Sequence, residues 1–467
     1  MPQRRQMHLG LSIANIGYHH AAWRHPDVPA DGAMRFEHYR RCARLAEEGR
    51  FDLIFLADTA SVRALDKPAF AREREHEQVK HEPLALMAAL AAITTRVGLV
   101  PTVSSTYAEP YNVARSVGAL DHLSHGRAGW NLVTGFCPDE ARNYGWDGVP
   151  PPDTRYARAP EFLDVVQALF DGWDDDAVPR DKASGVFFDR TKMHMLDHRG
   201  RFFKIRGPLD LPPLPQRRPP VFTAGTSEES QELAAKFADV VYAGKVTLDD
   251  ARSYYASVKG RLARYGRTPE ELLILPGIMT YVGRTRQEAQ DKFDQLQELL
   301  TPEHGLGLLA TYGLPDYSGH DLDAPVPDLP AGVEVFGQYA SVALAKARRE
   351  GLSIRQLYQM IGGGFWSLRA IGTAADIADL MEEWVTTGAA DGFNLQPPCV
   401  PISAEDFVAL VIPELQRRGL FRREYEGCTL REHLGLPPAI SRHARASGLP
   451  DELAAMPGTA NVARRHG

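Results

Sequence analysis

The sequence has few cysteines, no long apolar run and no signal-like N-terminus. Cys42, Cys137, Cys399 and Cys428 are far apart, so neither a CxxC pair nor a zinc-ligand spacing occurs, and free thiols in a reducing compartment are expected. No stretch of about 18 apolar residues predicts a membrane-spanning helix. Because no apolar segment follows the charged residues 1–10, we also expect no signal peptide. These absences predict a soluble, cytoplasmic protein.

Strong positive charge is also absent. The chain has 53 basic and 60 acidic side chains, a net charge of −7, and no basic stripe interleaved with aromatics. Nucleic acid is therefore not an expected partner. With 467 residues, 44% hydrophobic and 24% charged, the chain can bury a large core.

Apolar runs of strand length alternate with segments of helical period. Strands are expected at residues 8–14, 51–57, 97–101, 127–133, 220–224, 239–243, 274–282 and 392–395. Helices are expected at 36–49, 83–94, 112–123, 160–170, 228–237, 248–265, 286–300, 374–387 and 404–418.

This alternation predicts a (β/α)8 TIM barrel. Mostly continuous apolar strands indicate a parallel sheet that is buried on both faces, and eight strand–helix units close a barrel. An open doubly wound sheet is the alternative, but it would favour a GxGxxG turn after the first strand, and residues 14–20 contain none. We expect one barrel domain over residues 1–440, with insertions at about 174–219 and 301–368. Residues 441–467 are expected to form a tail that packs loosely or against a neighbouring subunit.

Polar side chains follow several predicted strands. Asp58 ends the second strand, where its carboxylate could bind a ligand or cap a helix. Among the hydroxyl residues expected after the third strand, Ser104 is the candidate for binding, although serines also form ordinary turns. Asn131 and Thr134 are expected at the end of the fourth strand, and a buried asparagine needs several hydrogen-bonding partners.

Two further segments and one histidine pair are candidates for function. Tyr156 is expected just before a helix, whereas Thr226 and Ser227 open another, where free N–H groups and a hydroxyl can bind phosphate. Ser227 could equally serve as a helix cap. His19 and His20 follow the first strand, and the near-neutral pKa of histidine makes His20 the candidate catalytic residue. No metal site is predicted.

Seven segments in order carry a family resemblance: AWRHP at 22–26, FLAD at 55–58, HLSHGRAGWNLVT at 122–134, RY at 155–156, AGTS at 224–227, ADGFNL at 390–395 and VIPELQRRGLFR at 411–422. Together they resemble the bacterial-luciferase-like flavin-dependent monooxygenases. The match is to the branch that contains nitrilotriacetate, dibenzothiophene-sulfone and long-chain alkane monooxygenases. It spans roughly residues 7–437.

The resemblance implies a two-component enzyme. A separate NAD(P)H:flavin reductase would supply FMNH2, and O2 would be used to oxygenate a small organosulfur, amine or hydrocarbon substrate. It also implies a homodimer or homotetramer. Asp58, Tyr156 and Ser227 match flavin-site positions, with the FMN phosphate between the last two. One departure is Pro152, where relatives commonly have a histidine.

Two other functions remain open at this point. One is a flavin- or deazaflavin-dependent dehydrogenase on the same barrel. Dehydrogenases of the deazaflavin type, however, lack the GWN signature that this chain has at 129–131 and the GFN signature that it has at 392–394. The other is a non-catalytic flavin-binding protein. Substrate identity is expected to depend on the two insertions, because these segments carry the least recognisable pattern.

Overall fold

The fold is a closed ring of eight parallel strands. The computed structural model describes residues 6–62, 76, 79–329 and 338–443. Each neighbouring pair in the ring is hydrogen-bonded in parallel, and β8 and β9 close it. The ring strands are β1 (His8–Ser12), β2 (Leu53–Leu56), β3 (Gly98–Ser104), β4 (Trp130–Val133), β7 (Val221–Ala224), β8 (Val240–Ala243), β9 (Leu273–Val282) and β11 (Gly392–Leu395). The predicted (β/α)8 barrel is confirmed.

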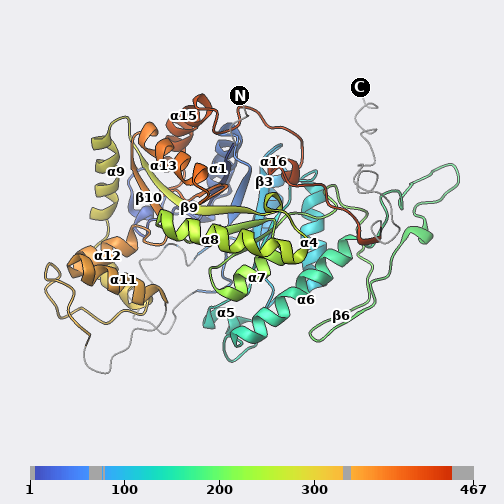
Figure 1. Cartoon of the computed structure of the whole chain (residues 1–467), viewed down its shortest axis with the longest axis horizontal. Helices are drawn as coiled ribbons and strands as arrows, with labels where there is room; N and C mark the ends of the chain where they lie inside the picture. Colours follow the sequence, from blue (N-terminus) through green and yellow to red (C-terminus); the bar gives the residue numbers. More distant parts are fainter. Residues whose placement is uncertain (1–5, 63–75, 77–78, 330–337, 444–467) are drawn as a thin grey trace.

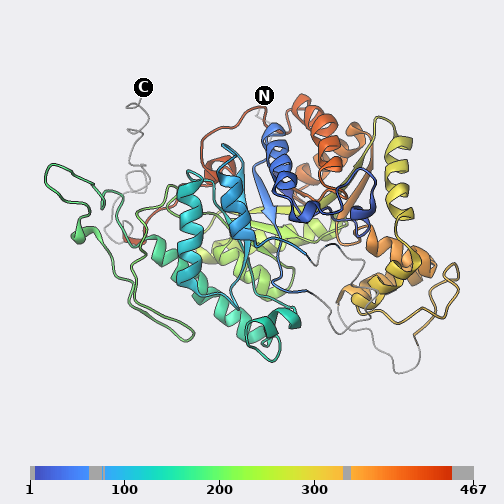
Figure 2. The ribbon, with the colours of Figure 1, turned by 180° about the vertical axis from the view of Figure 1, so that it is seen from behind.

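Helices surround the ring, as Figures 1 and 2 show from opposite sides. Several of them begin at a serine or threonine whose side chain accepts a backbone N–H from the first turn, which satisfies part of the helix terminus. The outer helices are α1 (Phe36–Glu48), α3 (Pro83–Ala91), α4 (Pro110–Leu123), α6 (Pro152–Phe170), α7 (Glu228–Phe237), α8 (Leu248–Arg261), α9 (Arg286–Glu298), α13 (Ala374–Thr386), α14 (Ile402–Asp406) and α15 (Ile412–Arg417).

A ninth parallel strand lies outside the ring. β10 (Leu368–Gly372) pairs only with the second half of β9, from Ile278 to Val282. β9 is ten residues long, so its first half can complete the ring while its second half extends beyond it. Sequence analysis missed β10, because the strand directly follows residues that were assigned to an insertion.

The amino-terminal end of the barrel is closed by side chains from the C-terminal segment. Leu430 of α16 (Leu430–His433), with Leu434 and Leu436 beyond it, joins the apolar cluster inside the ring. Gly98 and Gly129 allow this approach, because a Cβ on either would lie within 3 Å of the Leu430 side chain. The other end of the barrel, where the strands finish, carries the polar side chains.

Several predicted elements differ from the structure in their bounds or continuity. β3 extends to Ser104, so this serine ends the strand instead of following it. α6 begins at Pro152, and Tyr156 lies in its second turn instead of before the helix. The prediction began this helix at Pro160, but the helix runs through this proline and begins at Pro152, in the first turn, where proline is favoured. The closing helix is interrupted by a π-helical turn at Phe407–Val411.

The two predicted insertions differ in structure. The first contains a short hairpin, β5 (His198–Arg199) and β6 (Lys204–Ile205), on an arm that projects at the right of Figure 1. The second contains α10 (Pro302–Thr311), α11 (Gln338–Glu350) and α12 (Ile354–Gly362), which bury an apolar cluster of their own. The predicted tail lies outside the described residues beyond position 443. Among the described residues, every helix is too short or too polar to traverse a lipid bilayer.

Candidate active site

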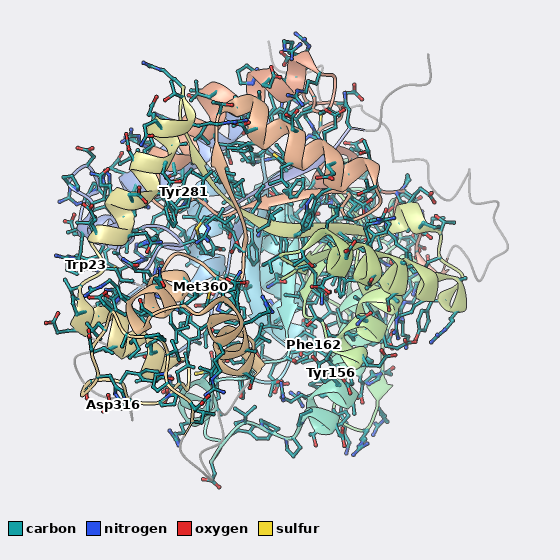
Figure 3. All side chains as sticks on the ribbon, turned by 60° about the vertical axis from the view of Figure 1, so that its left-hand side comes forward. Trp23, Tyr156, Phe162, Tyr281, Asp316 and Met360 are labelled. Carbon is teal, nitrogen blue, oxygen red and sulfur yellow. The ribbon has the colours of Figure 1, made fainter. Side chains whose placement is uncertain are left out.

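Seven of the eight candidate residues lie at the carboxyl ends of the ring strands or in the segments that follow them, and Asn131 is the second of the four residues of β4. His20 follows β1, Asp58 follows β2, and Ser104 ends β3. The remaining candidates belong to the β4 and β7 units: Asn131, Thr134, Tyr156, Thr226 and Ser227. In Figure 3, Tyr156 and Phe162 lie along α6 on one side of the central strands, whereas Trp23 and Met360 lie on the other.

Asn131 points into the barrel. Its neighbour Trp130 packs outward against Phe162 of α6, with ring centroids 6.4 Å apart, and side chains alternate along a strand. The Asn131 amide nitrogen donates to Thr102 Oγ1 over 3.0 Å. Its Oδ1 is buried without a hydrogen-bond partner among the described residues. A buried acceptor of this kind costs about 1–3 kcal/mol unless a ligand satisfies it.

Two more buried polar groups face the same interior, and sequence analysis did not select them. Asn394 of β11 has an Oδ1 that lies beside Gly10 of β1 and finds no hydrogen-bond partner in the described part of the chain. Tyr242 of β8 packs on Phe55 with ring centroids 4.4 Å apart, and its hydroxyl also lacks a partner within the described chain. Burial raises the pKa of Tyr242 well above its ordinary value, so the phenol remains a donor at neutral pH. The sequence signal available for Asn394 was its place in the strand, because side chains alternate between the two faces and Asn394 follows the apolar Phe393.

Ser104 and Thr134 come together around Gly135. Ser104 Oγ lies 3.7 Å from the position that a Gly135 Cβ would occupy. Thr134 Oγ1 accepts a hydrogen bond from Arg155 Nη1 over 3.5 Å, and the same guanidinium group donates to the Gly135 carbonyl. Arg155 therefore fixes the β4 end to the start of α6, a role that sequence analysis did not assign.

Asp58 lies at the edge of this cluster. Its carboxylate forms an ion pair with Lys80 Nζ at 3.0 Å, and both side chains are largely buried. The adjacent Ala60 N–H donates to Glu140 Oε1 of α5 (Pro138–Asn143) over 3.1 Å. The segment after β2 is thus tied to the segment after β4. Lys80 could not be selected from the sequence, because the pair spans 22 positions without a motif.

Ser227 is the N-cap of α7, as the capping interpretation predicted. Its side chain accepts the Ser230 N–H over 3.3 Å, and the side chain itself is exposed. Thr226 is half-buried, and its carbonyl accepts from Gln231 Nε2 over 3.0 Å. Tyr156 is half-buried on α6, which packs against α7. No hydrogen bond in the described structure joins the Tyr156 and Ser227 side chains.

His20 lies on a different side of the barrel mouth. Its Nε2 lies 3.4 Å from the Tyr312 hydroxyl, and its ring meets His304 of α10 edge-on, with centroids 6.4 Å apart. His20 Nδ1 is buried without a partner among the described residues. His20 is therefore separated from the Ser104–Thr134 cluster and lies beneath the second insertion.

His19 is buried beside His20 and remains neutral. Burial lowers the pKa of His19 to about 3, and the nearby His20 and His304 act in the same direction. The Ala21 N–H donates to His19 Nδ1 over 3.1 Å, so the single ring proton belongs on Nε2. His19 Nε2 has no acceptor within the described residues, so it is a buried donor at the mouth.

The site fits a flavin by the chemistry of its donors and acceptors. Inside the ring of strands, Asn131 and Asn394 offer amide oxygens and Tyr242 a hydroxyl that lack partners within the residues that the structure describes. An isoalloxazine ring presents N–H and carbonyl groups on one edge and a flat apolar body, which suits such a lining. For the described residues, no cluster of His, Cys, Asp and Glu could hold a metal ion.

Comparison with known proteins assigns the family. Residues 14–391 match the model of the family described as luciferase-like monooxygenase. The chain belongs to this family. The resemblance noted in the sequence is thereby confirmed, including the branch that it indicated, because the relatives below carry those names.

Three curated relatives are similar over nearly their full length. The N-acetyl-S-(2-succino)cysteine monooxygenase of Bacillus subtilis is 41% identical over 95% of this chain and 99% of its own. Component A of the nitrilotriacetate monooxygenase of Aminobacter aminovorans is 44% identical over 93% of this chain and 98% of its own length. The dibenzothiophene-sulfone monooxygenase of Rhodococcus erythropolis is 37% identical over 93% of this chain and 98% of its own length. An oxidoreductase of the monooxygenase type is therefore established.

Solved structures agree with this assignment. The long-chain alkane monooxygenase superposes with a TM-score of 0.80 at 32% identity, covering 92% of this chain and 95% of that protein. A riboflavin lyase solved with modified FMN and riboflavin gives a TM-score of 0.80 at 28% identity, and the match covers 93% of this chain and 96% of that protein. A luciferase-like barrel is thus shared by these proteins.

Proposed function

We propose that this enzyme uses FMNH2 from a separate reductase, together with O2, to insert one oxygen atom into a small organic substrate. The observation that carries the proposal is the set of buried polar atoms inside the ring that have no hydrogen-bond partner among the described residues, in a chain whose relatives are monooxygenases. A relative named as component A of its system supports a partner protein. The bound flavin supplies the redox chemistry.

The residues of the mouth bind and orient the cofactor. Asn131 Oδ1 and Asn394 Oδ1 would accept hydrogen bonds from the ring, and the Tyr242 hydroxyl would donate one. Ser104, Thr134 and Asp58 would surround the ring and its ribityl chain. The N-terminus of α7, with Thr226 and Ser227, would hold the phosphate, and Tyr156 on the adjacent α6 would donate its hydroxyl to it.

Arg155 is suited to replace the missing histidine at Pro152. It lies one turn further along α6, it is half-buried, and its guanidinium group reaches the β4 end. A fixed cation between Thr134 and Tyr156 favours an anionic cofactor. We infer that Arg155 stabilises the phosphate end of FMN in this chain.

His20 and the second insertion would serve the reacting end of the site. The insertion covers His20, because Tyr312 and His304 contact its ring and the Gly362 carbonyl accepts its backbone N–H over 3.0 Å. Such cover excludes water from the reaction. His20 Nδ1 would hydrogen-bond the substrate or exchange a proton with it.

Oxygen uptake with photoreduced FMN tests the proposal. The protein is mixed anaerobically with photoreduced FMN and then exposed to O2, with and without substrates from a panel of sulfones, sulfonates, aminopolycarboxylates and alkanes. Uptake of O2 coupled to an oxygenated product supports the proposal. In a parallel anaerobic mixture with oxidised FMN, reduction of the flavin by a substrate would indicate a dehydrogenase instead, and tight flavin binding without turnover would indicate a flavin-binding protein.

A further inference from the structure

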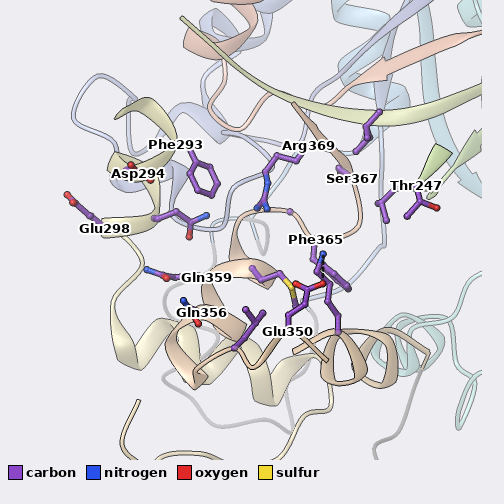
Figure 4. Close-up of a pocket in the computed structure, with 17 residues that line it drawn as sticks. Thr247, Phe293, Asp294, Glu298, Glu350, Gln356, Gln359, Phe365, Ser367 and Arg369 are labelled. Carbon is purple, nitrogen blue, oxygen red and sulfur yellow. Dashed lines mark ion pairs between the residues drawn. The ribbon is translucent and has the colours of Figure 1, made fainter. Parts of the chain in front are cut away.

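A cavity lies between α9, the second insertion and the segment that leads into β10. It has a volume of about 690 Å³ and is bounded by α9, α11, α12 and the segment that leads into β10 (Figure 4). Most of its wall belongs to the second insertion and the residues that follow it. The volume falls within the range of small-molecule sites.

Arg369 of β10, an exposed residue, is one of the two cationic residues that line this cavity, together with Lys346. Its side chain extends from the strand toward the cavity centre, near Phe293 and Phe365 (Figure 4). The guanidinium carbon lies 5.0 Å from the Phe293 ring centroid. In the part of the chain that the structure describes, Arg369 forms no ion pair or hydrogen bond, so its fork of donors is available to a ligand.

Gln297 of α9 supplies a second unsatisfied group in the same wall. The residue is only 6% exposed, and neither its Nε2 nor its Oε1 has a partner among the described residues. A buried amide without partners is costly, so a ligand that pairs with it gains that free energy. Gln297 and Arg369 both line this cavity.

The acidic residues of the cavity lie at its rim. Asp294 is exposed and accepts from Gln290 Nε2 over 2.9 Å. Glu350 is exposed and pairs with Arg349 at 3.0 Å and Lys346 at 3.8 Å. Glu298 is also exposed, and so is Arg369 itself, so water screens the charges of the carboxylates and of the guanidinium alike.

One wall of the cavity is formed by residues that follow the ring strands or contact residues that follow them. Ser367, in its wall, donates a hydrogen bond to Gln396, which follows β11 and lies against Gly277 of β9. Val246 and Thr247, which follow β8, form another part of the wall. The charge of Arg369 also reaches His19, where it is one of the groups that lower the pKa. A ligand in the cavity is therefore adjacent to the site that contains His20.

We propose that this cavity is the substrate subsite and that it selects an organic acid, whose carboxylate is held by Arg369 with help from Gln297. This inference rests on the proposed monooxygenase function. The carboxylate would accept paired N–H bonds from the guanidinium, and the Gln297 amide would donate to a remaining oxygen. The alkyl part of the substrate would lie against Met360, Phe365 and Leu368 and extend toward the barrel mouth.

Calorimetric titration of the flavin-free protein tests this anchor. The probes are thiodiacetate and its dimethyl ester, which share a skeleton but differ in charge. We expect the diacid to bind at least about tenfold more tightly than the ester, and Arg369→Gln to weaken diacid binding by about ten- to a hundredfold with no effect on the ester. Arg369→Lys should recover only part of the loss, because lysine lacks the planar fork. Arg44→Gln, at an exposed α1 position, is the matched control.

Three results would overturn the subsite. These are equal affinity for diacid and ester, diacid binding unchanged by Arg369→Gln, and no diacid binding to the wild-type protein. The ester comparison uses only the wild-type protein, so it remains decisive if a variant misfolds. Failure of O2-coupled turnover with diacid binding intact would count against the proposed function and leave the anchor in place. O2-coupled turnover that is restricted to uncharged substrates would count against the carboxylate anchor and leave the proposed function in place.

Discussion

Asn131 and Thr102 face each other across β4 and β3, joined by an Nδ2–Oγ1 hydrogen bond of 3.0 Å, while Asn131 Oδ1 is left without a partner among the described residues. The bond fixes the amide so that its oxygen points away from Thr102 and into the barrel. A protein that bears the cost of a buried acceptor commonly uses it at a binding site.

Replacing Asn131 should therefore weaken cofactor binding more than it affects folding. We expect Asn131→Leu to raise the FMNH2 dissociation constant about tenfold or more in an anaerobic titration. The free energy of unfolding should change by less than about 1 kcal/mol, because one hydrogen bond and one unsatisfied acceptor disappear together. Asn112→Ala, on the exposed face of α4, is the control. Unchanged FMNH2 affinity would remove Asn131 from the site.

The phosphate site can be tested with a double variant. Ser227→Ala together with Tyr156→Phe should weaken FMNH2 binding by more than about tenfold, or about 1.4 kcal/mol. Ser227→Ala also removes a helix cap, which should cost about 1 kcal/mol of stability. Thr285→Ala is the control, because Thr285 caps α9 in the same way: its Oγ1 accepts the Glu288 N–H over 3.1 Å. It should lose the same stability with no loss of affinity, whereas equal effects on affinity in both variants would reject the placement.

His20 should affect turnover and not cofactor affinity. We predict that His20→Asn lowers the rate of oxygenated product formation by about a hundredfold or more, the usual range for a general acid–base group. The FMNH2 dissociation constant should stay within about twofold. Tyr312→Phe, which removes the hydroxyl at 3.4 Å, should have a smaller effect. If the two variants behave alike, His20 has only a packing role.

The neutral state of His19 gives the protein a pH-dependent stability. Its pKa is lowered in the folded state to about 3, from an ordinary value of 6.5. Between these values the unfolded chain binds the proton and the folded chain does not, so stability falls as pH decreases through 6.5. The loss attributable to His19 should reach about 2 kcal/mol by pH 5. Urea denaturation of His19→Gln should show a shallower pH dependence, whereas His125→Asn at an exposed position should match the wild type.

The closure of the barrel by α16 predicts a large stability effect far from the site. Leu430 is fully buried inside the ring, so Leu430→Ala should lower the free energy of unfolding by about 2–5 kcal/mol. Leu123→Ala removes the same atoms from a side chain that is 61% exposed, and it should change stability by less than about 0.5 kcal/mol. Similar denaturation midpoints for the two variants would contradict the role of Leu430.

The barrel could be predicted from the sequence because its signals are local. Eight apolar runs bounded by helices are enough to indicate a ring of parallel strands, and Ser227 marks the start of α7 by its type alone. β10 was missed because its alternation of Leu368, Arg369 and Ala370 is short and follows a glycine-rich turn. The start of α6 differs from the predicted start at Pro160, because a proline usually marks a helix boundary and this helix continues through it.

The site was harder to predict than the fold, since its contacts join distant positions. Asn131 was selected because asparagine in an apolar strand is conspicuous, and Asn394 has the same property but was treated only as part of a motif. The Asp58–Lys80 pair and the approach of Tyr312 to His20 depend on how loops cross the mouth, which no spacing encodes. Gln297 resembles any polar residue of an amphipathic helix until α12 packs over it.

The position of α16 has a consequence for how the chain folds during synthesis. The leucines that fill the base of the barrel are made some 35 residues after the last ring strand, β11, so the ring cannot gain its complete interior until most of the polypeptide has left the ribosome. A nascent chain stopped just before Leu430 would hold every strand yet leave their bases in contact with water.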